Sequence, residues 1–275
     1  MAAAFFWQND DWYHSIGTTV LKRVQLPVRD FALPIPRSGS IEVHSGYGYL
    51  PQQGDEAHRL IQQQRGAANP KYKTEQKVSH SFEHAGYVFN VSGRIDGLID
   101  GAPPYLEEIK TAFDAKTLFE KLRDNPDHPY CLQLKTYAYI YSLQNGTVPA
   151  CGLLIGSYAN DARFELPMLL DIAAYERWLE LRLEELVAEA RQREEERERR
   201  KAVGASLQFP FEQPRAGQLD LIGTIERTIA TGDALMVQAP TGMGKTAGVI
   251  FPMLRDAMQR GQKLVTLHPK TASIR

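Results

Sequence analysis

Two acidic residues and a lysine stand at the ends of two short apolar segments in the first half of the chain. The segments are Gly93–Asp96 and Glu108–Thr111. Carboxylate oxygens are the ligands that hard cations such as Mg²⁺ prefer. A bound cation lowers the pKa of water and polarises a phosphate oxygen, which is what hydrolysis of a phosphodiester requires. The pattern therefore predicts that Asp96, Glu108 and Lys110 are the catalytic residues of a metal-dependent site.

The spacing within the second segment adds detail to this prediction. Because side chains alternate along a β-strand, Glu108 and Lys110 share one face and Ile109 points to the other. Lys110 can then orient the attacking water or stabilise the developing charge. The carbonyl of Ile109 is a candidate third oxygen ligand. The spacing also fits a structural ion pair at a sheet edge, which is a common use of such residues.

A second motif, Ala239–Thr246, is a phosphate-binding loop. Its glycines let backbone amides approach phosphates, while Lys245 can reach the β- and γ-phosphates of ATP and the hydroxyl of Thr246 can bind Mg²⁺. The general pattern has a glycine where this chain has Ala239. The predicted nucleotide-binding residues of this loop are Thr241, Gly242, Met243, Gly244, Lys245 and Thr246.

The elements that must position the first site follow from hydrophobic periodicity and turn residues. We expect a helix over Gly54–Gln64, strands over Lys73–Phe82, Tyr87–Val91, Arg94–Ile99 and Tyr105–Ile109, a helix over Leu132–Leu143 and a strand over Val148–Ile155. A weaker strand is expected over Ile41–His44. Asp171 is a candidate N-cap of a long helix. This order predicts an α/β fold with a mixed sheet.

The second half of the chain shows a change in composition. Residues 191–205 are dense in Arg and Glu, and they are either a helical spacer or the frayed end of the preceding helix. Beyond them we expect a helix near Leu219, a strand over Ala234–Gln238, a helix over Thr246–Gln259 and a strand over Lys263–Leu267. This pattern predicts the start of a parallel sheet around the phosphate loop.

Composition limits the class of protein. The net charge is −1, so contact with nucleic acid would require local basic patches. Two cysteines, Cys131 and Cys151, are too few for a disulfide framework. Residues 1–6 do not form a signal peptide, and no apolar run approaches the ~20 residues that span a bilayer. We therefore expect a cytoplasmic protein with no membrane contact.

The first half of the chain resembles the RecB-type branch of the PD-(D/E)XK nucleases. The match lies in His58 on a helix, the Gly-x-x-Asp and Glu-x-Lys strands, and Gln133 with Tyr137 on a later helix. It covers roughly residues 50–145. The resemblance implies that His58, Asp96, Glu108 and Ile109 bind Mg²⁺ or Mn²⁺, and that Gln133 and Tyr137 position the nucleic acid. It does not extend to an iron–sulfur cluster, which two cysteines cannot build.

Cations between the predicted His58 helix and the first long strand are candidate phosphate contacts. Each phosphate charge that they neutralise would add salt-dependent affinity. The same residues also fit an ordinary solvated face. They are Arg59, Arg65, Lys71, Lys73 and Lys77.

The end of the chain resembles DinG/XPD-like superfamily-two helicases. Pro214–Gln218 is similar to the element that precedes the phosphate loop there, which implies that Gln218 contacts adenine. Val265–Pro269 is similar to a strand that leads to a single-strand contact. The chain ends before the acidic box and second lobe that ATP hydrolysis and unwinding need. We therefore expect a fragment of a longer nuclease–helicase.

Taken together, the sequence predicts a nuclease domain over residues 1–190, a charged helical linker over 191–205 and an incomplete, RecA-like ATP-binding domain over 206–275. The expected function is metal-dependent DNA hydrolysis attached to an ATP-dependent motor, acting on DNA with single-stranded regions. Two alternatives stay open: a catalytically inactive DNA-binding module, and an ATPase switch without a role on DNA. The choice between DNA and RNA, the polarity of cleavage and the biological pathway are not predicted.

Overall fold

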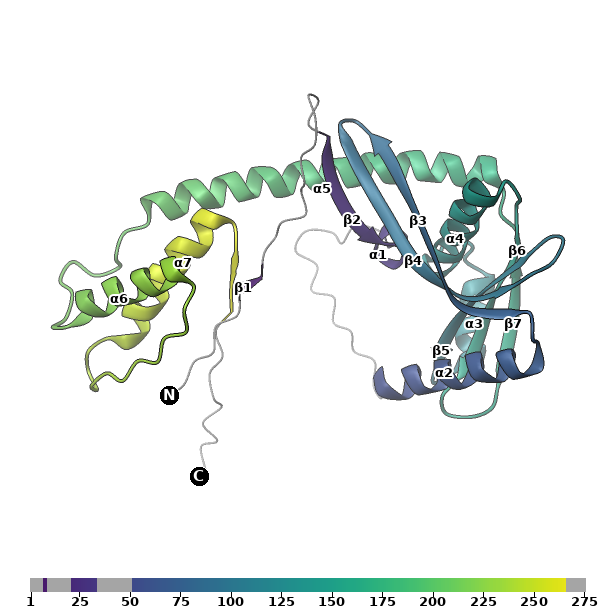
Figure 1. Cartoon of the computed structure of the whole chain (residues 1–275), viewed down its shortest axis with the longest axis horizontal. Coiled ribbons are helices and arrows are strands. Elements are labelled where there is room, and N and C mark those ends of the chain that lie inside the picture. Colours follow the sequence, from purple (N-terminus) through teal and green to yellow (C-terminus); the bar gives the residue numbers. More distant parts are fainter. Residues whose placement is uncertain (1–6, 9–20, 34–50, 266–275) are drawn as a thin grey trace. The chain divides into compact units, whose positions relative to one another are not determined.

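The structure is a computed structural model, and it describes residues 7–8, 21–33 and 51–265 (Figure 1). The described residues divide into two compact units. One contains residues 21–33 and 51–188, and the other contains residues 7–8 and 189–265. The division after residue 188 falls close to the end of the predicted nuclease domain at residue 190. The predicted strand over Ile41–His44 lies outside the described residues.

A mixed β-sheet flanked by helices forms the core of the 21–188 unit. Its strands are β2 (Lys22–Pro27), β3 (Tyr72–His84), β4 (Tyr87–Ile99), β5 (Tyr105–Ala112), β6 (Ala150–Ser157) and β7 (Arg163–Met168). The order across the sheet is β2-β4-β5-β6-β7, and β3 also pairs with β4. The β2–β4 and β5–β6 pairs are parallel, and the others are antiparallel. The α/β class and the mixed sheet predicted from the sequence are therefore confirmed.

Helices cover both faces of β5. They belong to a set of five in this unit: α1 (Val28–Phe31), α2 (Pro51–Ala68), α3 (Ala115–Arg123), α4 (Pro129–Asn145) and the first part of α5 (Ile172–Ser206). Ile109 packs against Ile61 of α2, whereas the next residue, Lys110, contacts Gln133 of α4. Because neighbouring side chains on a strand point to opposite faces, α2 and α4 lie on opposite faces of β5.

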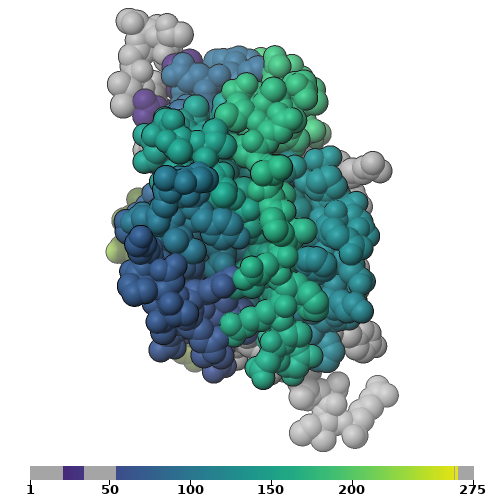
Figure 2. Space-filling model, turned by 90° about the vertical axis from the view of Figure 1, so that its right-hand side faces the viewer, coloured from purple at the N-terminus to yellow at the C-terminus, as the bar shows by residue number. Residues whose placement is uncertain are grey.

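Helix α2 lies at the surface beside the edge strand β7. Its residues Gln64 and Arg65 contact Arg163 and Glu165 of that strand. Figure 2 shows this face of the molecule, with the two elements coloured by residue number. On its other side, Ile61 reaches into the sheet, where it is buried with Ile109 and Leu154. The helix is thus held against the strand that carries Glu108 and Lys110.

Strand β4 is longer than the sequence predicts. The two strands expected over Tyr87–Val91 and Arg94–Ile99 are one continuous strand, so that part of the prediction is wrong. The residue taken as a break, Gly93, is extended and fills a packing role. A Cβ placed on Gly93 would lie 2.6 Å from the hydroxyl oxygen of Tyr137. Gly93 is therefore needed for the close approach of α4, not for a turn.

Helix α5 begins at Ile172, and Asp171 caps it as predicted, because its Oδ1 accepts from the amide of Ala174 at 2.9 Å. Its first part is tied to α1, because Arg182 donates to the carbonyl of Phe31 at 2.8 Å. The helix continues without interruption through the charged residues to Ser206. Residues 191–205 are therefore helical, and the helix is not frayed there.

The 189–265 unit contains the end of α5, α6 (Gln218–Thr231), α7 (Lys245–Arg260) and a two-stranded sheet of β1 (Trp7–Gln8) and β8 (Lys263–Leu264). Helices α6 and α7 pack through Leu221, Ile225 and Met253. The end of α5 joins this core where the Nε2 of Gln259 donates to the carbonyl of Gly204 at 3.3 Å.

The predicted parallel sheet of this unit is not formed in the described residues. Ala234–Gln238 is exposed and has no strand structure, so the prediction of a strand there is wrong. A β-strand needs a hydrogen-bonded neighbour, and β8 pairs instead with β1 in antiparallel orientation. Of the strand predicted over Lys263–Leu267, Lys263 and Leu264 form β8, Val265 is not in a strand, and residues 266–267 lie outside the described residues.

Candidate functional site

Asp96 and Glu108 meet where the strands β4 and β5 stop pairing. The last pair of their ladder is Gly97 with Glu107, so Asp96 and Glu108 occupy the next facing positions. The Oδ2 of Asp96 replaces the missing backbone contact, because it accepts from the amide of Ile109 at 2.7 Å. The same oxygen lies 3.1 Å from the Nε2 of His58. The helix α2 thus presents His58 to the end of the β4–β5 ladder.

Glu108 and Lys110 form a buried ion pair that also reaches α4. The Nζ of Lys110 donates to the Oε1 of Glu108 at 2.8 Å and to the Oε1 of Gln133 at 2.9 Å. It also lies 4.6 Å from the ring centroid of Tyr130. Glu108 is 3% exposed, and its second oxygen, Oε2, is buried without a hydrogen-bond partner among residues 7–8, 21–33 and 51–265. A buried carboxylate oxygen without a donor is unfavourable unless something else satisfies it.

The electrostatics of the three charged groups follow from this packing. Burial raises the pKa of Glu108 to about 7, although the nearby charge of Lys110 opposes the change. Burial lowers the pKa of Lys110, but the charge and hydrogen bond of Glu108 outweigh burial and raise that pKa overall. The hydrogen bond to Asp96 raises the pKa of His58, and burial acts against it. Lys110 is therefore charged at neutral pH, and both Glu108 and His58 hold protons more readily than usual.

Gln133 and Tyr137 lie one turn apart on α4, on the side of the helix that faces Glu108 and Lys110. Gln133 is 6% exposed and Tyr137 is 4% exposed. Burial raises the pKa of the Tyr137 hydroxyl, and so does the charge of Glu108. The structure thus brings together all six of the residues that the sequence grouped: His58, Asp96, Glu108, Lys110, Gln133 and Tyr137.

These residues do not form a ready-made metal site. In residues 7–8, 21–33 and 51–265, no group of three or more His, Cys, Asp and Glu side chains is arranged to hold a metal ion. The reason is that Asp96 is turned to His58 and to the amide of Ile109, while Glu108 is turned to Lys110. The contact of Ile109 is made by its amide, not by the carbonyl that we expected to act as a ligand.

The donor set nevertheless fits a hard divalent cation. The buried Oε2 of Glu108 is an oxygen ligand that lacks a partner within the described residues. Asp96 and His58 supply a second carboxylate and an imidazole 3.1 Å apart. Mg²⁺ and Mn²⁺ bind carboxylate oxygens, and Mn²⁺ also accepts imidazole. The residue types at this position therefore match the cation that the sequence predicted.

Sequence reasoning missed several residues that hold the site together. Gln62, one turn after His58, donates through Nε2 to the carbonyl of Asp96 at 3.0 Å and to the Oε1 of Glu75 at 3.1 Å. Tyr130 packs over Lys110. The spacing of His58 and Gln62 by four residues is a signal that they share a helix face. Glu75 and Tyr130 carry no comparable signal.

A half-buried ion pair contacts β5 on its opposite face. The Nη2 of Arg65 lies 2.8 Å from the Oε2 of Glu107, and the hydroxyl of Tyr72 donates to the Oε1 of Glu107 at 2.7 Å. Arg65 was predicted as a phosphate contact, and the structure shows it paired with Glu107 and with Glu165. Its guanidinium therefore holds α2 against strands β5 and β7.

The phosphate loop of the other unit leads into helix α7. Gly242 has φ 89° and Gly244 has φ 78°, which are backbone conformations that favour glycine. The Nζ of Lys245 donates to the carbonyls of Ala239 and Pro240, both at 3.0 Å. Met243 packs against the α6–α7 core. Lys245 and Thr246 are exposed, and so is Thr241.

Gln218 holds this loop from the start of α6. It is 2% exposed, and its Nε2 donates to the carbonyl of Gly244 at 2.9 Å. Its Oε1 accepts from the amide of Arg215 at 3.0 Å. The amide that we expected to contact adenine is thus engaged with the loop backbone.

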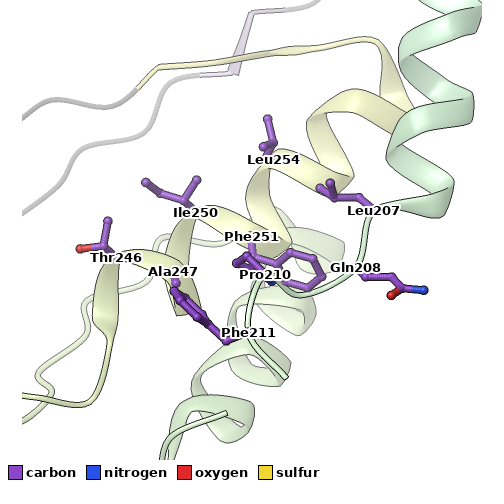
Figure 3. A pocket seen from close by; sticks show the side chains of 9 residues that line it. All are labelled: Leu207, Gln208, Pro210, Phe211, Thr246, Ala247, Ile250, Phe251 and Leu254. Atoms are coloured by element: carbon purple, nitrogen blue, oxygen red, sulfur yellow. The ribbon is translucent and has the colours of Figure 1, made fainter. Parts of the chain in front are cut away.

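An apolar pocket of about 450 Å³ lies next to the loop (Figure 3). The segment after α5 supplies Phe211 on one side, and α7 supplies Phe251 on the other, with Thr246 at its edge. Its full lining is Leu207, Gln208, Pro210, Phe211, Thr246, Ala247, Ile250, Phe251 and Leu254.

Comparison with known proteins adds little to this description. No family model matches the chain, and no curated protein matches it. One matching solved structure is described as "Crystal structure of SSO0001". It is 22% identical, covers 62% of this chain and 78% of its own, and has a TM-score of 0.39. A likeness at this TM-score carries no argument about function.

Among the helices that the structure describes, none combines the length and the apolar composition needed to cross a bilayer.

Proposed function

We propose that the protein is a metal-dependent DNA nuclease of the kind that its sequence resembles, the RecB-type PD-(D/E)XK nucleases. One observation carries the proposal. Asp96, Glu108 and Lys110 gather where two strands diverge, and one buried oxygen of Glu108 has no hydrogen-bond partner in the part of the chain that the structure describes. A buried acceptor without a donor is costly, and a bound cation would remove that cost.

The proposed roles follow from the contacts. Asp96, Glu108, His58 and the carbonyl of Ile109 would hold Mg²⁺ or Mn²⁺, which supplies an activated water and a polarised phosphate oxygen. Lys110 stays protonated beside Glu108, so it can orient that water or stabilise charge on the phosphate. Gln133 holds the Nζ of Lys110 from α4. By resemblance, Gln133 and Tyr137 also position the nucleic acid.

The test is a cleavage assay on labelled single-stranded, duplex and flapped DNA, with Mg²⁺, Mn²⁺ or EDTA. We expect cleavage with either metal and none with EDTA. Asp96→Ala and Lys110→Ala should each reduce the rate by at least about 10²-fold, because each removes a group that acts on charge in the transition state. Circular dichroism of both variants controls for folding. Cleavage at the wild-type rate by both folded variants would eliminate the mechanism.

An inactive DNA-binding module is the second candidate. It is favoured by the absence, among the described residues, of three metal-binding side chains already arranged around one point. In that case the same fold would hold DNA without cutting it. A gel-shift assay that shows DNA binding, combined with no cleavage in Mn²⁺, would identify this alternative.

For the 189–265 unit we propose ATP binding at the phosphate loop, as part of a DinG/XPD-like motor. The support is the positive φ of Gly242 and Gly244 and the start of α7 at Lys245, which leaves the first amides of that helix for phosphate. The Nζ of Lys245 donates to two loop carbonyls, and it can exchange these neutral acceptors for a charged phosphate oxygen.

A further inference from the structure

Glu75 has a backbone conformation that its position in the strand does not explain. Its φ is 56°, in the left-handed region that residues other than glycine rarely adopt. It lies inside the 13-residue strand β3, at the fourth position, and the strand is paired with β4 on both sides of it. Glutamate has no special tolerance for this region, in contrast to Asn and Asp. A strained residue that a fold keeps is a reason to look for a function near it.

The strained residue faces Asp96. Thr74 pairs with Gly97 and Gln76 pairs with Ile95, so Glu75 and Asp96 stand at facing positions of β3 and β4. In the described β3–β4 ladder, this is the one position between Tyr72 and His84 that does not pair. The break in the ladder therefore coincides with the predicted metal ligand.

The carboxylate of Glu75 joins two side chains beside the site. Its Oε1 accepts from the Nε2 of Gln62 at 3.1 Å, and its Oε2 lies 3.0 Å from the Nε of Arg94. Gln62 also donates to the carbonyl of Asp96 at 3.0 Å. Because His58 is one turn earlier on α2, Gln62 and His58 share a helix face. A contact that holds the side chain of Gln62 in place therefore also holds the helix face that carries His58 and the backbone of Asp96.

A second strained residue offers a comparison within the same hairpin. Ala85 has φ 46° and is followed by Gly86 with φ 85°. Two positive φ values in a two-residue hairpin connection are what a type I′ turn requires. The conformation of Ala85 is thus explained by the turn, whereas that of Glu75 is not.

We propose that Glu75 is a positioning residue for the site, and that its left-handed backbone directs its carboxylate to Gln62. Through Gln62 it holds α2 against β4, so that His58 and Asp96 keep the separation at which both can bind one cation. This inference rests on the proposed metal site, and it adds a residue that the nuclease resemblance does not include.

The test compares Glu75→Gly with Ala85→Gly, since both changes relieve the same kind of backbone strain. In the metal-free protein we expect both variants to melt within about 4 °C of wild type. The amide of Ile109, which donates to Asp96, should exchange its hydrogen at least about tenfold faster in Glu75→Gly and at the wild-type rate in Ala85→Gly. Unchanged exchange in Glu75→Gly would overturn the proposal.

Metal binding gives a second readout that does not depend on cleavage. Mn²⁺ should raise the melting temperature of wild type and of Ala85→Gly, and about tenfold more Mn²⁺ should be needed for the same rise in Glu75→Gly. Glu75→Gln keeps an acceptor for Gln62 and should behave like wild type. If Glu75→Gln is as defective as Glu75→Gly, the route through Gln62 is wrong.

The outcomes separate this proposal from the proposed function. If wild type binds Mn²⁺ but cuts no DNA, the nuclease proposal fails while the exchange and Mn²⁺ comparisons still decide the role of Glu75. If Glu75→Gly does not fold, Gln62→Leu replaces it, since that variant leaves the strand intact. Gln62→Leu should then show the faster exchange and the weaker Mn²⁺ effect, and wild-type behaviour in that variant would exclude the role.

Discussion

At the scale of single residues, the buried carboxylate of Glu108 is the most informative group. An ionised carboxylate is costly to bury unless it is paired, and Lys110 pairs with just one of its two oxygens. Burial accordingly raises its pKa to about 7. A divalent cation would favour the ionised form and would satisfy the second oxygen. The burial that makes Glu108 costly in the metal-free protein is thus what would make it a strong ligand.

This balance predicts opposite effects of pH with and without metal. The folded-state pKa of Glu108 is raised to about 7, so the stability that its protonation contributes is lost as pH rises through about 7. The pKa of His58 is also raised, so the stability from its protonation is likewise lost as pH rises. Cation binding needs both groups deprotonated and therefore strengthens over the same range. In EDTA, the melting temperature should fall as the pH is raised from 6 to 8.5. Over the same range, the rise in melting temperature that Mn²⁺ produces should become larger. A Mn²⁺ effect that shrinks as pH rises would contradict this assignment.

At the scale of elements, the site depends on how closely α4 approaches β4. The approach is possible because Gly93 has no side chain, and a Cβ there would lie 2.6 Å from the hydroxyl oxygen of Tyr137. The glycine of the Gly-x-x-Asp segment therefore has a packing reason that is independent of catalysis. It lets α4 bring Gln133 to Lys110.

Gly93→Ala should consequently destabilise the protein by about 1–3 kcal/mol, the usual cost of overpacking. Urea denaturation measures the loss, and Gly66→Ala in α2 is the control. A Cβ on Gly66 would meet no atom within 4 Å, and alanine is the better helix former, so that variant should be at least as stable as wild type. The cost of Gly93→Ala should shrink in a Tyr137→Ala background; full additivity would show that the two residues do not clash.

At the scale of the whole molecule, the two candidate sites belong to different compact units. The carboxylate–lysine site lies in residues 21–188, and the phosphate loop lies in residues 189–265. Each unit has its own apolar core, with Ile109 in one and Leu221 in the other. Local changes at one site should therefore leave the chemistry of the other intact.

Two variants test this independence. Lys245→Ala should remove the increase in melting temperature that ATP with Mg²⁺ produces, because it removes the charge that reaches the phosphates. It should leave metal-dependent cleavage within about twofold of wild type, as expected for sites that belong to separate compact units. Asp96→Asn should abolish metal-dependent cleavage and leave the increase in melting temperature with ATP and Mg²⁺ unchanged. Loss of both activities in either variant would show that the two sites are coupled.

Much of the first unit could be predicted because local signals and long-range packing agree there. Asp171 caps α5 as its side-chain chemistry indicates, and alternation along β5 placed Glu108 beside Lys110. The strained Glu75 could not be predicted, since its conformation depends on partners from α2 and β4. The prediction of a strand over Ala234–Gln238 was wrong for a related reason. Its composition favours a strand, but a strand forms only beside a strand with which it can pair.

The most direct measurement for the central claim is a Mn²⁺ titration of the nucleotide-free protein at pH 8, followed by electron paramagnetic resonance. Wild type should bind one ion per chain, and Glu108→Gln should weaken that binding by at least about tenfold, the size of effect expected when the ligand shell of a metal is altered. Because this variant leaves the buried charge of Lys110 without its carboxylate partner, circular dichroism must show that it is folded as wild type. Equal Mn²⁺ binding by wild type and Glu108→Gln, or no binding by wild type, would contradict the account.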